Sequence, residues 1–264
     1  MRILNFLFSR SKQEQDKPIR DKLKTRKDFE RVLAEDLDIM ETTKARMDTA
    51  KNINLYMYRS LSYSYILILQ SKYSVDAKID ELRDIYIKSM HYFLQAFNKR
   101  NPIYADILNY VSLGVLLNIP DNNFRQLIDY VKQMDKQAKP SGWTPDLLLW
   151  FMLNSRMKEQ EKQKYAETLA YPRLYNGLYK VIQAPNAAAA KDALSKYLDR
   201  WYNLNSNAPW YNSHLKDNSY RGYWAWEVAA VAKIMHIDDS DLKNNQYYPY
   251  DMVHWADNET TAKK

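Results

Sequence analysis

The chain contains no cysteine and only four glycines among its 264 residues. The absence of cysteine excludes disulfide frameworks, thiolate metal sites, thiol nucleophiles and lipid attachment through cysteine. Glycine makes up about 7% of an average protein, so this deficit argues against folds that need many tight hairpins, bulges or phosphate-binding loops. Helices need neither residue, and the sequence therefore favours a helical fold.

Long hydrophobic runs are also missing. The apolar stretch at residues 3–8 is too short for the core of a secretory signal, and no small-residue cleavage site follows it. The longest other apolar run, residues 147–153, is too short to span a bilayer. We therefore expect a protein without a membrane span that is located in the cytoplasm.

Positive charge is in excess, but nearly all of that excess lies in one segment. The formal net charge is +7, and residues 1–27 alone hold nine Lys and Arg against three acids. The rest of the chain is close to neutral, so it lacks the overall basic surface that nucleic-acid binding requires. Two stretches, residues 28–41 and 238–259, each carry six acids and one base and are locally acidic.

Hydrophobic periodicity predicts an all-α fold, and 46% hydrophobic residues are enough to build a core. The clearest amphipathic helix is expected at residues 76–98, with Ile79, Leu82, Tyr86, Met90, Phe93 and Phe97 on its buried face. Further helices are predicted at about residues 25–53, 56–70, 104–117, 121–134, 146–153, 158–169, 174–183, 187–202 and 221–235. In the first of these, one face carries Phe29, Val32, Leu33, Leu37, Met40, Met47, Ala50 and Ile53. No segment shows the alternation of a strand.

The clearest break in the chain is the segment KPSG at residues 139–142. We expect a flexible basic arm at 1–17, an N-terminal helical domain at 18–139, a C-terminal helical domain at 140–256 and a polar tail at 257–264. Each helical subdomain would contain several antiparallel helices, and the two would pack together. LLNIPD at 116–121 and IMHIDD at 234–239 suggest that one helix corner is used twice.

Two of the helix starts carry capping signals. Asp121 follows Pro120 and is expected to accept hydrogen bonds from the free amides of the next helix. Thr144, Pro145 and Asp146 are typical of an N-cap, a first-turn proline and a first-turn acid.

Common catalytic and cofactor motifs are absent: the sequence lacks GxGxxG, the P-loop, GxSxG and HExxH. The four histidines, His91, His214, His236 and His254, are scattered. His236 with Asp238 and Asp239, or His254 with Asp251, offers chemically adequate metal ligands, but the spacing fits no dedicated metal motif. We expect no metal and no cofactor, and interpret these side chains as helix caps and surface residues.

Glu227 is unusual because it lies in the apolar segment GYWAWEVAAVAKIM, residues 222–235. Its carboxylate must face the one wet side of this segment or be buried with a hydrogen-bond partner. A buried hydrogen-bonding node is the simpler interpretation, because general acid chemistry would need a second carboxylate close by.

Aromatic residues gather around this segment and could stack on nucleic-acid bases. They are Tyr197, Trp201, Tyr202, Trp210, Tyr211, Tyr220, Tyr223, Trp224 and Trp226. A base-stacking platform also needs a positive groove, whereas this region is nearly balanced in charge. Packing in a core or an interface is therefore the better interpretation.

The C-terminal string GYWAWEVAAVAKIMHIDDSDLKNNQYYPYDMVHW, residues 222–255, with KDALSKYLDRWYN at 191–203, resembles the C-terminal domain of PoNi-type immunity proteins. PIRDKLKTRKDFERVLAED at 18–36 is similar to the start of the N-terminal domain of that family. The resemblance implies an all-helical, non-enzymatic immunity protein. Such proteins are cytoplasmic antidotes to polymorphic DNase toxins delivered in interbacterial competition, including by type VI secretion. The basic extension before Pro18 is not part of the family pattern.

A cognate nuclease toxin is therefore the expected protein partner, and direct nucleic-acid binding is not expected. A nuclease presents a basic cleft to DNA, so acidic patches would speed and orient its capture by an inhibitor. The candidate contact residues are Glu227, Asp238, Asp239, Asp241, Tyr247, Tyr248, Asp251 and Trp255. The acidic run of Glu35, Asp36, Asp38 and Glu41 is a second candidate.

Two other functions stay open at the level of sequence. A helical nucleic-acid-binding protein would use the basic arm and the aromatic residues. A metal-dependent hydrolase would be built on Glu227, Asp238, Asp239 and His254. The sequence also leaves the toxin, the oligomeric state, including a homodimer, and the mode of inhibition open.

Overall fold

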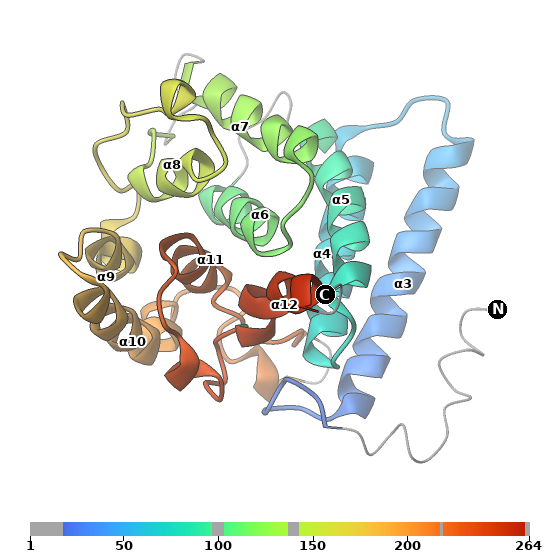
Figure 1. Ribbon diagram of the computed structural model, residues 1–264. Helices are drawn as coiled ribbons and strands as arrows, with labels where there is room; N and C mark the ends of the chain where they lie inside the picture. Colours follow the sequence, from blue (N-terminus) through green and yellow to red (C-terminus); the bar gives the residue numbers. More distant parts are fainter. Residues whose placement is uncertain (1–17, 97–102, 137–142, 217–218, 262–264) are drawn as a thin grey trace. The chain divides into compact units, whose positions relative to one another are not determined.

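The computed structural model describes residues 18–96, 103–136, 143–216 and 219–261, with side chains up to Trp255 (Figure 1). These residues form ten α-helices and no strand, which confirms the predicted all-α class. The helices are α3 (Arg26–Thr49), α4 (Leu55–Ser74), α5 (Ile79–Ala96), α6 (Tyr104–Leu116), α7 (Asp121–Lys136), α8 (Leu147–Asn154), α9 (Pro172–Ile182), α10 (Ala187–Leu204), α11 (Trp226–Met235) and α12 (Tyr250–Thr261). No helix in the described ranges combines the length and apolar character needed to cross a membrane.

The chain divides into two compact units. The first comprises residues 1–100 with 212–223, and the second comprises residues 101–211 with 224–264. These compact units differ from the predicted domains at 18–139 and 140–256, and that division stays a prediction. The difference arises because α6 and α7 belong to the second unit, and because a short segment from the C-terminal half packs into the first. The basic arm at 1–17 lies outside the described residues.

In the first unit, α4 packs against both α3 and α5. Thr25 begins α3 with a reciprocal capping box to Asp28, and the Asn54 side chain accepts a hydrogen bond from the Met57 amide at the start of α4. The predicted stripe on α5 is buried at every described position. The Ser89 hydroxyl adds a hydrogen bond of 2.8 Å to the Ser62 carbonyl and so joins α5 to α4.

The predicted apolar face of α3 is only partly correct. Phe29, Val32 and Leu33 are buried, but the face does not continue to the end of the helix, and Ile53 beyond it is exposed. The helix extends past the residues that cover its first turns, so the later apolar positions are partly exposed to solvent.

Residues 212–223 complete the core of the first unit. The Tyr220 hydroxyl donates to the buried Asp21 carboxylate, and its ring lies 5.8 Å from that of Phe29. The Ser74 hydroxyl donates to the Arg221 carbonyl at 2.8 Å. The first unit therefore depends on residues that follow its own helices by more than a hundred positions.

In the second unit, α11 is the central helix and contacts α6, α8, α9, α10 and α12. Its apolar sequence is consistent with this position, because a helix that is hydrophobic on most sides must be buried on most sides. In α7 and α10, apolar residues that recur every three or four positions are all buried: Phe124, Leu127, Ile128, Val131 and Met134 in α7, and Ala190, Leu194, Tyr197 and Trp201 in α10.

The two helix corners suggested by the internal repeat have the same geometry. Asn118 after α6 and His236 after α11 both adopt left-handed backbone angles, with φ of 44° and 52°. The next residue is a buried isoleucine in each case, Ile119 and Ile237, and its amide bonds to a carbonyl five residues earlier. This is the Schellman arrangement, which satisfies the last carbonyls of a helix.

Four local predictions in the second unit were wrong. Residues 158–169 form only the short 3₁₀ turn Glu159–Glu161, because this charged segment has no apolar stripe to bury. Asp121 pairs with Arg156 instead of capping α7. The N-cap of α8 is Asp146, not Thr144, and it accepts a hydrogen bond of 2.8 Å from the Leu149 amide. α11 begins at Trp226, not at residue 221.

Candidate partner-binding surface

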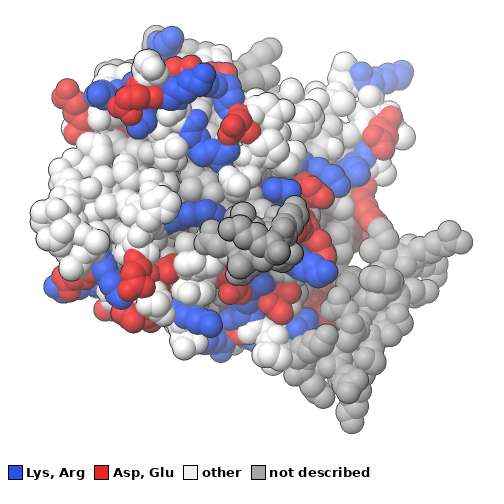
Figure 2. Space-filling model, in the orientation of Figure 1, with Lys and Arg blue, Asp and Glu red and all other residues white. Residues whose placement is uncertain are grey.

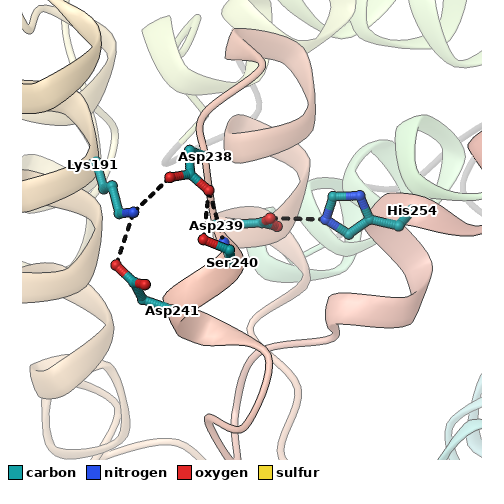
Figure 3. A network of polar contacts seen from close by, with 6 residues as sticks. All are labelled: Lys191, Asp238, Asp239, Ser240, Asp241 and His254. Atoms are coloured by element: carbon teal, nitrogen blue, oxygen red, sulfur yellow. Dashed lines mark hydrogen bonds and ion pairs between the residues drawn. The ribbon is translucent and has the colours of Figure 1, made fainter.

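The connection between α11 and α12 carries three aspartates that point in two directions (Figure 3). Asp238 and Asp241 point toward α10 and its Lys191, whereas Asp239 points the other way, toward His254 on α12. The short 3₁₀ turn Ser240–Leu242 reverses the chain between them and sets this alternation. Three acids that are almost consecutive in sequence thus have different roles in the structure.

Asp238 and Asp241 are both exposed, and both pair with Lys191. The Lys191 ammonium lies 2.7 Å from the Asp238 carboxylate and 2.8 Å from that of Asp241. Asp238 also accepts hydrogen bonds from the amide and hydroxyl of Ser240. The Lys191 and Ser240 donors lower the pKa of Asp238 below its ordinary value, so this carboxylate is fully charged at neutral pH.

Asp239 is buried and holds the end of the connection in place. One of its oxygens accepts a hydrogen bond of 2.7 Å from the Tyr248 hydroxyl, and the other lies 2.8 Å from Nε2 of His254. Tyr248 is buried as well. Asp239 and Tyr248 therefore lie beneath the connection between α11 and α12 and are not accessible to a partner.

Glu227 lies in the first turn of α11 and is half-buried. Its carboxylate accepts a hydrogen bond of 2.6 Å from the indole nitrogen of Trp201 on α10. Burial raises the pKa of Glu227 to about 7. Burial also raises the pKa values of the Tyr175 and Tyr197 hydroxyls, and the negative charge of Glu227 raises them further. Glu227 is thus a node that joins α11 to α10, as the simpler sequence interpretation held.

The remaining candidates are at least partly accessible. Asp251 is exposed in the first turn of α12, and Trp255 is half-buried, with its indole nitrogen donating to the Leu116 carbonyl at 2.8 Å. Tyr247 is half-buried and stacks on Tyr202 with ring centroids 5.3 Å apart. Asp238, Asp241, Asp251, Tyr247 and Trp255 are therefore the accessible members of the predicted set, which we name the α12-side surface.

The second acidic run is divided by burial. Glu35, Asp38 and Glu41 are exposed, but Asp36 is buried and paired with Arg221 in the first unit. This run therefore offers three accessible acids to a partner, not four.

The described residues do not bring together a site for either alternative function, the metal-dependent hydrolase or the nucleic-acid-binding protein. In the described residues, no three His, Asp or Glu side chains converge where they could hold a metal ion. Most of the aromatic residues considered for base stacking are buried, namely Tyr197, Trp201, Tyr220, Tyr223, Trp224 and Trp226. Figure 2 shows acidic and basic side chains interspersed on the visible face, without a broad area of one sign. The basic arm of the nucleic-acid hypothesis lies outside the described residues.

Comparison with known families gives two matches that together cover most of the chain. Residues 11–129 match the N-terminal model of PoNe immunity proteins, and residues 144–252 match the C-terminal model of the same proteins. The chain belongs to the PoNi family of immunity proteins. This confirms the resemblance seen in the sequence, and the C-terminal match contains nearly all of the candidate contact residues. The N-terminal match begins at residue 11, so the expectation that the whole extension before Pro18 lies outside the family pattern was wrong for residues 11–17.

The fold has also been seen before. The crystal structure of protein PA2201 from Pseudomonas aeruginosa superimposes with a TM-score of 0.70, at 18% sequence identity and with 93% of each chain covered. At this identity the likeness concerns the fold alone. No curated protein matches the chain.

Two residues of this PoNi chain were not identified as functional from sequence. Lys191 lies about fifty positions before the acids that it pairs, and nothing in their spacing indicates that contact. Tyr202 was grouped with the packing aromatics, yet it is half-buried and stacks on a predicted contact residue. The contact between α10 and the connection that precedes α12 can be recognised only from the three-dimensional structure.

Proposed function

We propose that this chain binds a cognate PoNe-type nuclease toxin in the cytoplasm of the producing bacterium and stops it from cutting DNA. The observation that carries the proposal is the pair of family matches, which covers the N-terminal and C-terminal immunity domains in order. The proposed activity is stoichiometric binding without turnover.

The α12-side surface is the proposed contact face for the toxin. Asp238, Asp241 and Asp251 are exposed carboxylates, and Tyr247 adds a partly accessible aromatic ring. A nuclease must carry Lys and Arg where it follows the DNA backbone. Carboxylates on an inhibitor attract such a surface over a distance of about one Debye length and raise the association rate.

The members of the predicted set that are held by internal hydrogen bonds, Asp239, Tyr248 and the half-buried Glu227, have a positioning role in this proposal. Asp239 and Tyr248 fix the connection before α12, and Glu227 fixes α11 against α10 through Trp201. An ordered contact face loses less conformational entropy on binding than a mobile one, so this support contributes to affinity without direct contact.

Survival of bacteria that express the toxin tests the proposal. Cells that express the cognate PoNe-type nuclease domain should die, and co-expression of the chain should restore growth. The matched control is Arg221→Met, which removes a buried partner of Asp36 and should fail to protect because it destabilises the protein. Failure of the intact, folded chain to protect against that domain would contradict the proposal.

A further inference from the structure

The surface of α10 carries a stripe that ends in a patch of aromatic rings. Lys191, Ser195, Asp199 and Tyr202 recur every three or four residues and so lie on one side of the helix. The stripe runs from residue 191 to residue 202, which is about 16 Å at the helical rise of about 1.5 Å per residue. Its first end holds Asp238 and Asp241 through Lys191, and its last end stacks against Tyr247.

The aromatic patch consists of Tyr202, Trp210, Tyr211 and Tyr247, all half-buried. Tyr202 is its centre: it stacks on Tyr211 with centroids 4.5 Å apart and on Tyr247 with an angle of 5° between the ring planes. Trp210 stacks in turn on the buried Trp201. The rings therefore hold one another in place and present part of their surface to solvent.

A rigid base lies beneath this patch. The Trp201 indole that supports Trp210 and Tyr247 donates its N–H to Glu227 on α11. Rings that are fixed before binding lose little conformational freedom when a partner packs on them, and aromatic anchors of this kind dominate many protein interfaces.

The charges beside the patch indicate which partner it suits. Asp199 is exposed one turn before Tyr202, and Asp238 and Asp241 share the single ammonium of Lys191 farther along the stripe. Two carboxylates thus pair with one ammonium and Asp199 adds a third negative charge, so these four side chains carry a net negative charge. Phosphate-bearing nucleic acid is disfavoured beside such a stripe, whereas a cationic side chain is attracted to both its carboxylates and its aromatic faces.

We propose that the aromatic patch is the anchor at which an arginine side chain of the toxin's DNA-following surface stacks, with Asp199 as its ion-pair partner, while Asp238 and Asp241 at the other end of the stripe attract further cations of that surface. Arginine fits this position better than lysine, because its planar guanidinium stacks on aromatic rings and also forms paired hydrogen bonds to a carboxylate. The inference rests on the proposed function, and it adds Tyr202, Tyr211 and Asp199 to the contact residues.

The decisive experiment measures the dissociation constant for a catalytically inactive PoNe-type nuclease domain. The double variant Tyr202→Leu with Tyr211→Leu keeps apolar volume but removes the π faces, and it should weaken binding at least tenfold. Tyr202→Phe with Tyr211→Phe keeps those faces and should stay within about threefold of the wild type. Tyr56→Leu with Tyr63→Leu, at two exposed tyrosines of α4, is the remote control and should not change binding.

Two measurements keep the inference testable if the leucine variant unfolds. Oxidative footprinting of the wild-type complex should show protection of Tyr202 and Tyr211, and Asp199→Asn should slow association severalfold at low salt while the melting temperature is unchanged. Binding by the wild type with neither protection nor loss of affinity would overturn the inference and leave the proposed function intact. Protection by a single-stranded oligonucleotide in place of the toxin would contradict both, and so would failure of the wild type to bind the toxin domain.

Discussion

Arg221 donates hydrogen bonds from Nε and Nη2 to the two carboxylate oxygens of Asp36, each at 2.8 Å, although 185 positions separate the two residues. Both side chains are buried, with 9% and 3% of their surface exposed. A buried carboxylate with a two-pronged guanidinium partner is satisfied only while both residues are present. The pair therefore couples the integrity of the first unit to a segment far away in the sequence.

Removing one member of this pair should strongly destabilise the protein. Arg221→Met leaves the Asp36 carboxylate buried without its partner, and we expect a loss of about 3–5 kcal/mol in the free energy of unfolding. Denaturant unfolding measures it. Replacing both residues, Asp36→Leu with Arg221→Met, should recover most of the loss. The exposed pair of Arg83 and Asp80 is the control, and Arg83→Met should cost less than about 1 kcal/mol. A similar small cost at Arg221 would contradict the structural role of the pair.

The dependence of the first unit on residues 212–223 also predicts that the N-terminal half does not fold by itself. A fragment of residues 1–139 lacks Tyr220 and Arg221, so Asp36 would lose its guanidinium partner and Asp21 would lose the hydroxyl that donates to its second oxygen. We expect this fragment to show no cooperative thermal transition by circular dichroism. A cooperative transition at the melting temperature of the full chain would show that residues 212–223 are dispensable.

Regular hydrophobic spacing made much of the fold predictable from sequence. The stripes on α5 and α7 consist of apolar residues every three or four positions between polar ones, and their burial follows from that pattern alone. The pattern did not predict α12, because its apolar residues are few. The helix predicted at residues 158–169 was wrong, because this charged segment has no apolar stripe to bury and forms only a short 3₁₀ turn.

The accessible face was less predictable than the helices. Asp239 and Asp36 each lie in an acidic run that is typical of a solvated surface, yet both are buried. Their partners, His254 with Tyr248 in one case and Arg221 in the other, reach them through chain folding. A run of acids therefore indicates local charge, but only tertiary contacts decide which carboxylates point outward.

Glu227 should make the stability of the protein depend on pH. Its pKa is raised from 4.5 to about 7 in the folded protein, so between these values the folded state binds more protons than the unfolded state. The contribution of this carboxyl to the free energy of unfolding is therefore fully present below about pH 4.5, and it is lost as the pH rises through about 7. We expect Glu227→Gln, which keeps an acceptor for Trp201, to stabilise the protein by about 1–2 kcal/mol at pH 8.

Thermal unfolding of wild type and Glu227→Gln at pH 5 and pH 8 checks this expectation. The two proteins should differ little at pH 5, where the wild-type carboxyl is largely protonated. An equal difference between the two proteins at both pH values would show that the carboxyl does not titrate in this range.

Neighbouring aspartates should differ in what their replacement changes. Asp238→Asn with Asp241→Asn removes two exposed charges, so we expect slower association with the inactive toxin domain and a nearly unchanged melting temperature. The rate difference should shrink as salt is added, because screening weakens attraction between exposed charges.

Asp239→Asn should show the opposite pattern. It disturbs the buried contacts to Tyr248 and His254, and we expect it to cost about 1–3 kcal/mol in stability. Stopped-flow association and thermal unfolding, carried out on both sets of variants, separate the two effects. A stable Asp239→Asn protein that associates slowly would place this carboxylate in the interface instead of beneath it.

The most direct test of the immunity function is a titration of nuclease activity with the purified chain. A fixed amount of the active PoNe-type domain is mixed with increasing amounts of the protein, and DNA cleavage is followed. Binding without turnover predicts that cleavage falls linearly and ends at a fixed ratio of the two proteins, and that active nuclease is recovered when the complex is separated in denaturant and refolded. Undiminished cleavage at a large excess of the chain, or permanent inactivation by far less than one equivalent, would contradict the account.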